Sequence, residues 1–138
     1  MKPEYLHLNQ HLCRTALASM VAISGLVAQA APADALRGEQ VYARCLACHA
    51  LATDRVGPRH CGLIGRRAAT VAGFDYSVAM KKSGLVWDEK TLDLFLKKPL
   101  KLVPGSSMTY DGVPDATERH DLIAYLKKVN TEAECRIK

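Results

Sequence analysis

The sequence predicts an all-α domain made of short helices joined by long loops. Three segments carry helical signals, and the stretches between them contain glycine and proline. No stretch shows the alternation of apolar and polar residues that is typical of a strand. The chain has 138 residues, of which 49% are hydrophobic and 24% charged. This composition is typical of a globular protein, and the length excludes a multidomain enzyme.

The first and last predicted helices lie at the two ends of the domain. Asp34 can cap a helix that runs towards Cys45, because its carboxylate accepts hydrogen bonds from the first turn. The last helix runs from about residue 117 to 130. Its apolar stripe consists of Leu122, Leu126 and Val129, and Ile123 lies beside it. Gly38 fits a close approach of two helices with Tyr125 packing across it, although ordinary flexibility at a helix start is the alternative.

The middle helix is predicted to begin after Asp88 and to end at Pro99. Its apolar face consists of Leu92, Phe95 and Leu96. Three short helices separated by long loops would form a poor hydrophobic core by themselves. A large apolar ligand at the centre would supply the core that the chain lacks.

Residues 45–48 read Cys-Leu-Ala-Cys and are followed by His49. C-x-x-C-H is the attachment signature of a c-type haem. Two thiols that add to the vinyl groups of one porphyrin must lie on the same edge of the ring, and two intervening residues give that separation. His49 then lies beneath the porphyrin, where its imidazole can bind the iron. The alternatives are a redox dithiol, which lacks a surrounding βαβ pattern, and half of a zinc site, which lacks a second suitably spaced ligand pair.

The sixth iron position decides between an electron carrier and an open ligand-binding site. Met108 closes the turn-rich loop 103–108, and a loop allows its thioether to approach the iron from the face opposite His49. A buried loop methionine is the alternative for Met108. Met80 lies in a short helical-looking stretch, where a core or surface methionine is the simpler interpretation.

Residues 1–30 are predicted to be a signal peptide, so the domain would span residues 31–138. Residues 15–33 carry no charge and hold about fourteen strongly apolar residues, fewer than the roughly twenty of a bilayer-spanning helix. Ala28-Gln29-Ala30 offers the small-x-small pattern that signal peptidase accepts. A retained membrane anchor is the alternative. Export predicts an oxidising compartment such as the periplasm.

Beyond the C-x-x-C-H pattern, a series of motifs follows in a fixed order. They are Gly38 with Tyr42, Gly57-Pro58, Gly65-Arg66, Gly73-Phe74-Asp75-Tyr76, Trp87, Pro104-Gly105-Ser106-Ser107-Met108 and Asp121-Leu122-Ile123-Ala124-Tyr125-Leu126. The series resembles class I cytochrome c, the family of bacterial and mitochondrial electron carriers, from about Asp34 to Asn130. The resemblance implies the small cytochrome c fold, with helices and loops wrapped around one covalently bound haem c.

The resemblance also implies roles for individual residues. The carbonyl of Pro58 would accept a hydrogen bond from His49, and Met108 would be the sixth ligand. Three residues match family positions whose polar groups surround the haem propionates, and these are Arg66, Tyr76 and Trp87. Such donors suit two carboxylates held near a low-dielectric core. Plain core packing is the alternative for Trp87.

Several residues depart from the family pattern. Phe95 replaces a tyrosine whose hydroxyl reaches towards the methionine sulfur, and Met80 replaces a common asparagine. Ser106-Ser107 stands where Thr-Lys is common, and His60 takes a position often filled by a leucine packed on the haem. These changes concern the tuning of the redox potential and leave the predicted fold intact.

The function implied is that of a soluble, monomeric, periplasmic electron carrier that is not an enzyme. Two alternatives stay open: a peroxidase or gas-binding haem protein with an open sixth position, and a bound subunit of a dehydrogenase or oxidase. The net charge of +5 allows acidic partners. Arg44, Arg55 and Lys101 resemble part of the family's basic ring at the haem edge. The expected partners are redox proteins (respiratory or photosynthetic complexes, or periplasmic dehydrogenases) rather than nucleic acid.

Signal-peptide cleavage would remove Cys13, and haem attachment would use Cys45 and Cys48, which leaves Cys61 and Cys135 as an even pair in an oxidising compartment. We expect them to form a disulfide, and the packing of the family's last helix makes the distance plausible. The alternative is two unpaired thiols, with Cys61 buried as a small apolar residue.

Overall fold

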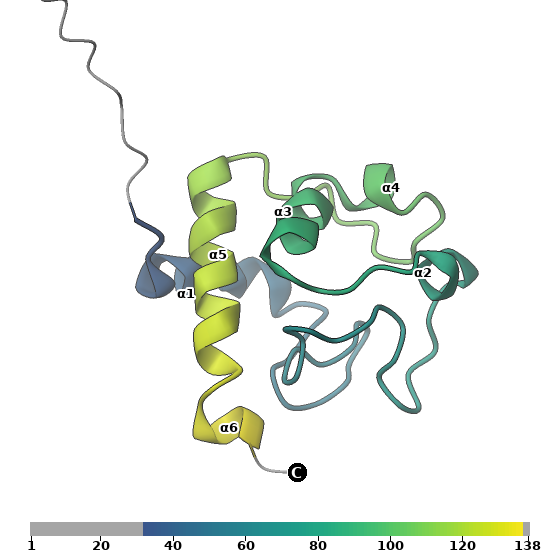
Figure 1. Ribbon diagram of the computed structural model, residues 1–138, viewed down its shortest axis with the longest axis horizontal. Helices are drawn as coiled ribbons and strands as arrows, with labels where there is room; N and C mark the ends of the chain where they lie inside the picture. Colours follow the sequence, from purple (N-terminus) through teal and green to yellow (C-terminus); the bar gives the residue numbers. More distant parts are fainter. Residues whose placement is uncertain (1–31, 137–138) are drawn as a thin grey trace, which may run out of the picture.

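The computed structural model describes residues 32–136, and helices make up its regular structure (Figure 1). The elements are α1 (Ala35–Tyr42), the 3-10 turn η1 (Ala43–Cys45), α2 (Val78–Lys82), α3 (Glu89–Lys97), α4 (Pro99–Leu102), α5 (Ala116–Val129) and α6 (Ala133–Arg136). Within these residues the β structure is a single isolated bridge between Arg67 and Val86. The predicted all-α class is therefore confirmed. The predicted signal peptide, residues 1–30, lies outside the described residues.

Helices α1 and α5 cross in close contact (Figure 1). The cause is Gly38, where an added Cβ atom would lie 1.9 Å from the carbonyl oxygen of Asp121 and 2.8 Å from Cβ of Tyr125. Only a residue without a side chain allows this separation, which confirms the close approach expected at Gly38. Asp34 caps α1 as predicted, because its side chain accepts hydrogen bonds from the backbone N–H groups of Leu36 and Arg37.

A buried carboxylate fixes the same crossing. Asp121 is 2% exposed, and its two oxygens accept hydrogen bonds from Arg37, with Nε at 2.7 Å and Nη2 at 3.0 Å. The backbone N–H of Asp34 donates a third bond at 2.6 Å. The hydrogen bond from the guanidinium holds the pKa of Asp121 below its usual value. The buried carboxylate of Asp121 thereby has direct hydrogen-bond partners at the contact between α1 and α5.

Helix α3 presents the predicted apolar face to the core, and Asp88 caps it through a reciprocal pair of bonds with Thr91. The helix ends at Lys97, and Pro99 begins α4, so Pro99 starts a second short helix as well as ending the first. Pro suits this first position because it has no N–H to leave unpaired. Buried Arg119 donates to Asp93 at 2.7 Å and so ties α5 to α3.

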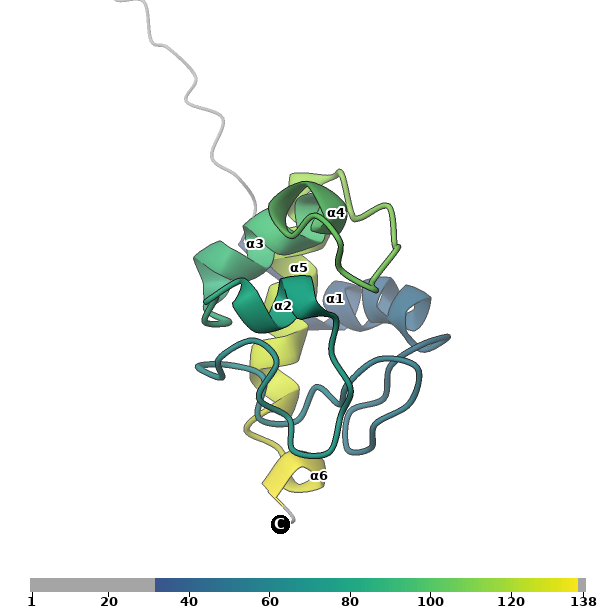
Figure 2. The same cartoon turned by 90° about the vertical axis from the view of Figure 1, so that its right-hand side faces the viewer.

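Two long connections complete the fold, one between η1 and α2 and the other between α4 and α5. The segment between η1 and α2 forms loops at the end of the molecule opposite α3 and α4 (Figures 1 and 2). A disulfide joins Cys61 in this segment to Cys135 in α6, with a Cα–Cα distance of 4.9 Å. Within residues 32–136, no helix combines the length and apolar character required to cross a bilayer.

Candidate haem-binding site

A cavity of about 430 Å³ lies between the helices and the loops. Its walls come from the end of α1, the segment 45–66, α2, α3, the loop after α4 and the inner face of α5. The eight residues that the sequence assigns to the cofactor all line it. They are Cys45, Cys48, His49, Pro58, Arg66, Tyr76, Trp87 and Met108. The volume and predominantly apolar lining suit a large flat apolar ligand.

The two thiols and His49 share one hydrogen-bonded turn. The chain leaves α1 through η1, and the backbone N–H groups of Cys48 and His49 both donate to the carbonyl of Cys45, at 3.1 and 2.9 Å. Neither cysteine is in a disulfide. Burial raises the pKa of the Cys45 thiol to about 11, against the lowering effect of Arg44. Both sulfurs are therefore free for thioether bonds along one edge of the cavity.

The hydrogen bonding and burial of His49 suit a metal ligand. Its Nδ1–H donates to the carbonyl oxygen of Pro58 at 2.8 Å, because a carbonyl can only accept. Nε2 is then the unprotonated nitrogen, and burial lowers the pKa of the ring and keeps it neutral. A Cβ atom on Gly57 would lie 2.2 Å from Cε1 of His49, so only glycine fits beside the imidazole. This cradle and the open Nε2 fit an axial ligand of a haem iron.

The structure brings both candidate methionines to the cavity. Met108 comes from the loop after α4, where its backbone N–H donates to Oγ of buried Ser106 at 3.2 Å. Met80 is buried in α2, and the hydroxyl of Ser83 lies 3.9 Å from its sulfur. Met108 therefore comes from an irregular loop, whereas Met80 belongs to a helix.

The three predicted propionate neighbours all line the cavity. The Arg66 guanidinium donates to the carbonyls of Cys61 and Arg59, each at 3.0 Å. Trp87 is buried with its ring centroid 5.0 Å from that of Phe95, and its backbone pairs with Arg66. Tyr76 packs edge-on against Phe74. Arg66 thus brings a positive charge to the cavity lining, as a bound dicarboxylate requires.

Sequence reasoning missed part of the lining. Leu63 and Tyr110 line the cavity but stand in irregular loops, where no periodic signal identifies an inward-facing residue. His60 was noted as a departure from the family pattern, without a role. In the structure its ring stacks on His49 with centroids 4.3 Å apart, and burial lowers its pKa to about 3.

The helices and the cavity define a class of protein: a small all-α domain built around a covalently attached porphyrin. Comparison with known proteins identifies the family. The chain is 42% identical to cytochrome c2 of Blastochloris viridis over 113 residues, which cover 80% of this chain and 89% of that protein. It is 43% identical to cytochrome c2 of Rhodomicrobium vannielii over 99 residues, which cover 70% of this chain and 79% of that protein.

A solved structure agrees with these relatives. Cytochrome cH from Methylobacterium extorquens superposes with a TM-score of 0.67 and 43% sequence identity, over 69% of this chain and 98% of that one. No protein-family model matches the chain. The chain belongs to the class I c-type cytochromes. Its cofactor is one covalently attached haem c, and proteins of this family are electron carriers.

Proposed function

We propose that this protein is a soluble periplasmic electron carrier whose haem iron is ligated by His49 and Met108. One observation carries the proposal: the hydrogen bond from His49 to Pro58 leaves Nε2 as the ligating atom, in the same cavity as Met108 and the two free thiols. The cavity thus offers one ligand from each of two separate segments, as six-coordinate iron requires.

The residues have distinct roles in this proposal. Cys45 and Cys48 hold the porphyrin through thioether bonds, and Pro58 fixes the tautomer and orientation of His49. When bound, the haem supplies one-electron chemistry between ferric and ferrous iron. Met108 would be the second protein ligand of the iron and would keep substrates from the metal, so the protein would not be an enzyme. The polar groups of Arg66, Tyr76 and Trp87 would surround the haem propionates and donate hydrogen bonds to them.

The proposal includes export and a partner surface. Residues 1–30 would be removed as a signal peptide, leaving residues 31–138 as the domain. The Cys61–Cys135 disulfide supports an oxidising compartment, because such bonds persist in the periplasm and are rare in the cytosol. The partners would be respiratory or photosynthetic complexes, or periplasmic dehydrogenases, that dock at the haem edge.

Replacement of the two methionines tests the coordination. Met108→Ala is expected to keep the covalent haem, lose the methionine–iron absorption and bind added cyanide or carbon monoxide. Its potential should fall, because a thioether is a weak neutral ligand that favours ferrous iron. Met80→Ala is the matched control, since Met80 also lines the cavity. It should keep the absorption and lose only packing, at a cost of about 2–5 kcal/mol. The opposite pattern would assign ligation to Met80.

A further inference from the structure

We propose that His60 is a positioning residue that sets the plane of the His49 imidazole through ring stacking. The two rings are 4.3 Å apart between centroids and 21° from parallel, so one face of His49 rests on His60. This inference rests on the proposed role of His49 as axial ligand. It adds a residue to the coordination environment that neither the C-x-x-C-H motif nor the Pro58 hydrogen bond contains.

The Pro58 hydrogen bond alone does not fix the ring plane. An N–H···O bond tolerates a broad range of angles, so the imidazole can rotate while Nδ1 keeps its acceptor. Gly57 lies against one end of the ring, where an added Cβ atom would be 2.2 Å from Cε1, 2.6 Å from Nε2 and 2.7 Å from Nδ1. A flat group against the ring face removes the remaining rotation, because any turn of the imidazole would drive an edge into its neighbour.

His60 can serve as such a support because it is itself held from several directions. Its Nδ1 shares a 3.0 Å hydrogen bond with the hydroxyl of Tyr42 at the end of α1. Its backbone N–H donates to the carbonyls of Ala50 and Leu51, both at 3.1 Å. Its carbonyl accepts a bond of 3.2 Å from the side chain of Asn130. His60 is thus contacted by the end of α1, by the loop that contains Ala50 and Leu51, and by the end of α5.

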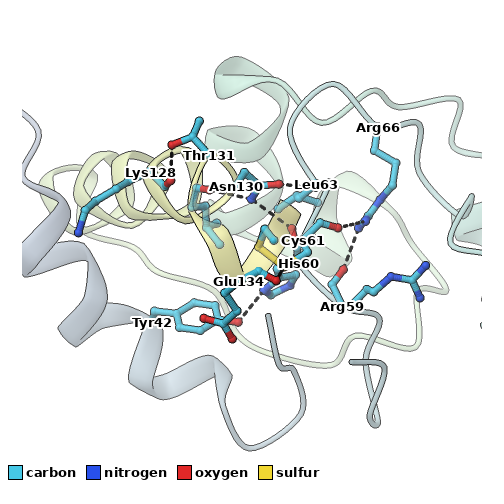
Figure 3. The surroundings of a disulfide bond; sticks show 12 residues. Tyr42, Arg59, His60, Cys61, Leu63, Arg66, Lys128, Asn130, Thr131 and Glu134 are labelled. Atoms are coloured by element: carbon cyan, nitrogen blue, oxygen red, sulfur yellow. Dashed lines mark hydrogen bonds between the residues drawn. A yellow bond between two sulfur atoms is a disulfide. The ribbon is translucent and has the colours of Figure 1, made fainter. Parts of the chain in front are cut away.

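The disulfide completes this support (Figure 3). Cys61 directly follows His60 and is bonded to Cys135 in α6. Asn130 also accepts a bond of 2.9 Å from the backbone N–H of Leu63, and Arg66 donates to the carbonyl of Cys61 at 3.0 Å. The residues that directly follow His60 are therefore anchored by the disulfide and by these hydrogen bonds. The imidazole of His60 therefore has little freedom to move aside if the ring of His49 rotates.

The plane of an axial imidazole has a spectroscopic consequence. The π orbital of the ring lies perpendicular to its plane, so the orientation of the plane selects the direction in which the ring interacts with the iron and the porphyrin. In the ferric protein this direction contributes to the spread of the proton NMR shifts of the haem methyl groups, together with the second axial ligand. It also sets the anisotropy of the electron paramagnetic resonance signal. A purely structural residue would move neither.

The test compares three variants of the haem-loaded protein in the ferric state. His60→Leu removes the flat ring and is expected to change the order or spread of the haem methyl shifts. His60→Phe restores a flat face without the bond to Tyr42, and its spectrum should return towards that of the unaltered protein. His120→Leu is the matched control, because His120 is an exposed histidine on α5. It should leave the spectrum unchanged.

Each outcome decides the proposal. The proposal is wrong if folded His60→Leu has the same haem methyl shifts as the unaltered protein. It is also wrong if the haem methyl shifts of His60→Phe match those of His60→Leu. If His60→Leu does not fold, His60→Phe is compared directly with the unaltered protein, and a pattern far from it counts against stacking. The methionine–iron absorption of the unaltered protein tests the ligation separately. If the unaltered protein lacks the methionine–iron absorption, both the proposed function and this inference are wrong. If it has the absorption and His60→Leu leaves the methyl pattern unchanged, only this inference is wrong.

Discussion

The guanidinium of Arg44 donates to both carboxylate oxygens of Glu118, at 2.8 and 2.5 Å. The pair joins η1, next to Cys45, to the first turn of α5. The guanidinium holds the pKa of Glu118 below its usual value, so the carboxylate is charged at neutral pH. Arg44 was expected to be part of a basic docking ring. Glu118 compensates part of this charge, so we expect Arg44 to contribute less to docking than Lys101, which is exposed on α4.

This pairing changes the expected effects on partner docking. Electron exchange with an acidic redox protein should slow as salt rises, because the Debye length falls from about 30 Å at 0.01 M to about 10 Å at 0.1 M. Lys101→Glu should slow the exchange at low salt, whereas Glu118→Gln should accelerate it by releasing the charge of Arg44. Lys127→Glu is the control, since Lys127 is already paired with Glu89. Stopped-flow rates over a salt series measure this, and rates independent of salt would contradict electrostatic steering.

The second prediction concerns the crossing of α1 and α5. Gly38→Ala places a methyl group where the backbone of Asp121 already lies, so the helices must separate. We expect a loss of about 1–3 kcal/mol in the free energy of unfolding, measured with guanidinium chloride on the haem-loaded protein. Gln40→Ala is the control on the same helix, because Gln40 is exposed. Equal stability of Gly38→Ala and the unaltered protein would show that the close approach is not required.

The third prediction concerns the disulfide. It links residues separated by 74 positions, for which the chain-entropy model gives a stabilisation of roughly 4 kcal/mol. The double variant Cys61→Ser with Cys135→Ser should therefore unfold at lower denaturant concentration. A mild reductant should lower the denaturant concentration at which half of the unaltered protein is unfolded. It should leave the unfolding midpoint of the double variant unchanged. Titration of the denatured, unreduced protein should find no reactive thiol, and two reactive thiols would refute the bridge.

The fourth prediction follows from the lowered pKa of Asp121. A carboxylate whose pKa is depressed by folding stabilises the protein above its unfolded pKa of about 3.9, and this contribution is lost as pH falls through the folded pKa. Asp121→Asn should therefore cost about 1.5–3 kcal/mol at neutral pH. The difference from the unaltered protein should shrink below about pH 4. Unfolding curves at a series of pH values measure this, and a difference that is constant with pH would contradict the assignment.

Much of the local structure could be predicted from the sequence. Asp34 and Asp88 cap the helices predicted for them, since capping depends only on neighbouring backbone N–H groups. The last helix was predicted from about 117 to 130 and runs from Ala116 to Val129. Pro99 was predicted only to end a helix, and the additional start of α4 was missed because four-residue helices carry little pattern.

The sequence by itself determined the residues whose chemistry depends on spacing along the chain: Cys45, Cys48 and His49, which one turn holds together. Only the tertiary structure decided which distant residues meet them. The stacking of His60 on His49 depends on contacts from α1, α5 and α6 that converge on one loop. The pairing of Arg44 with Glu118 joins residues 74 positions apart. Such partners are set by the way helices pack around the cavity, and no local periodicity encodes that arrangement.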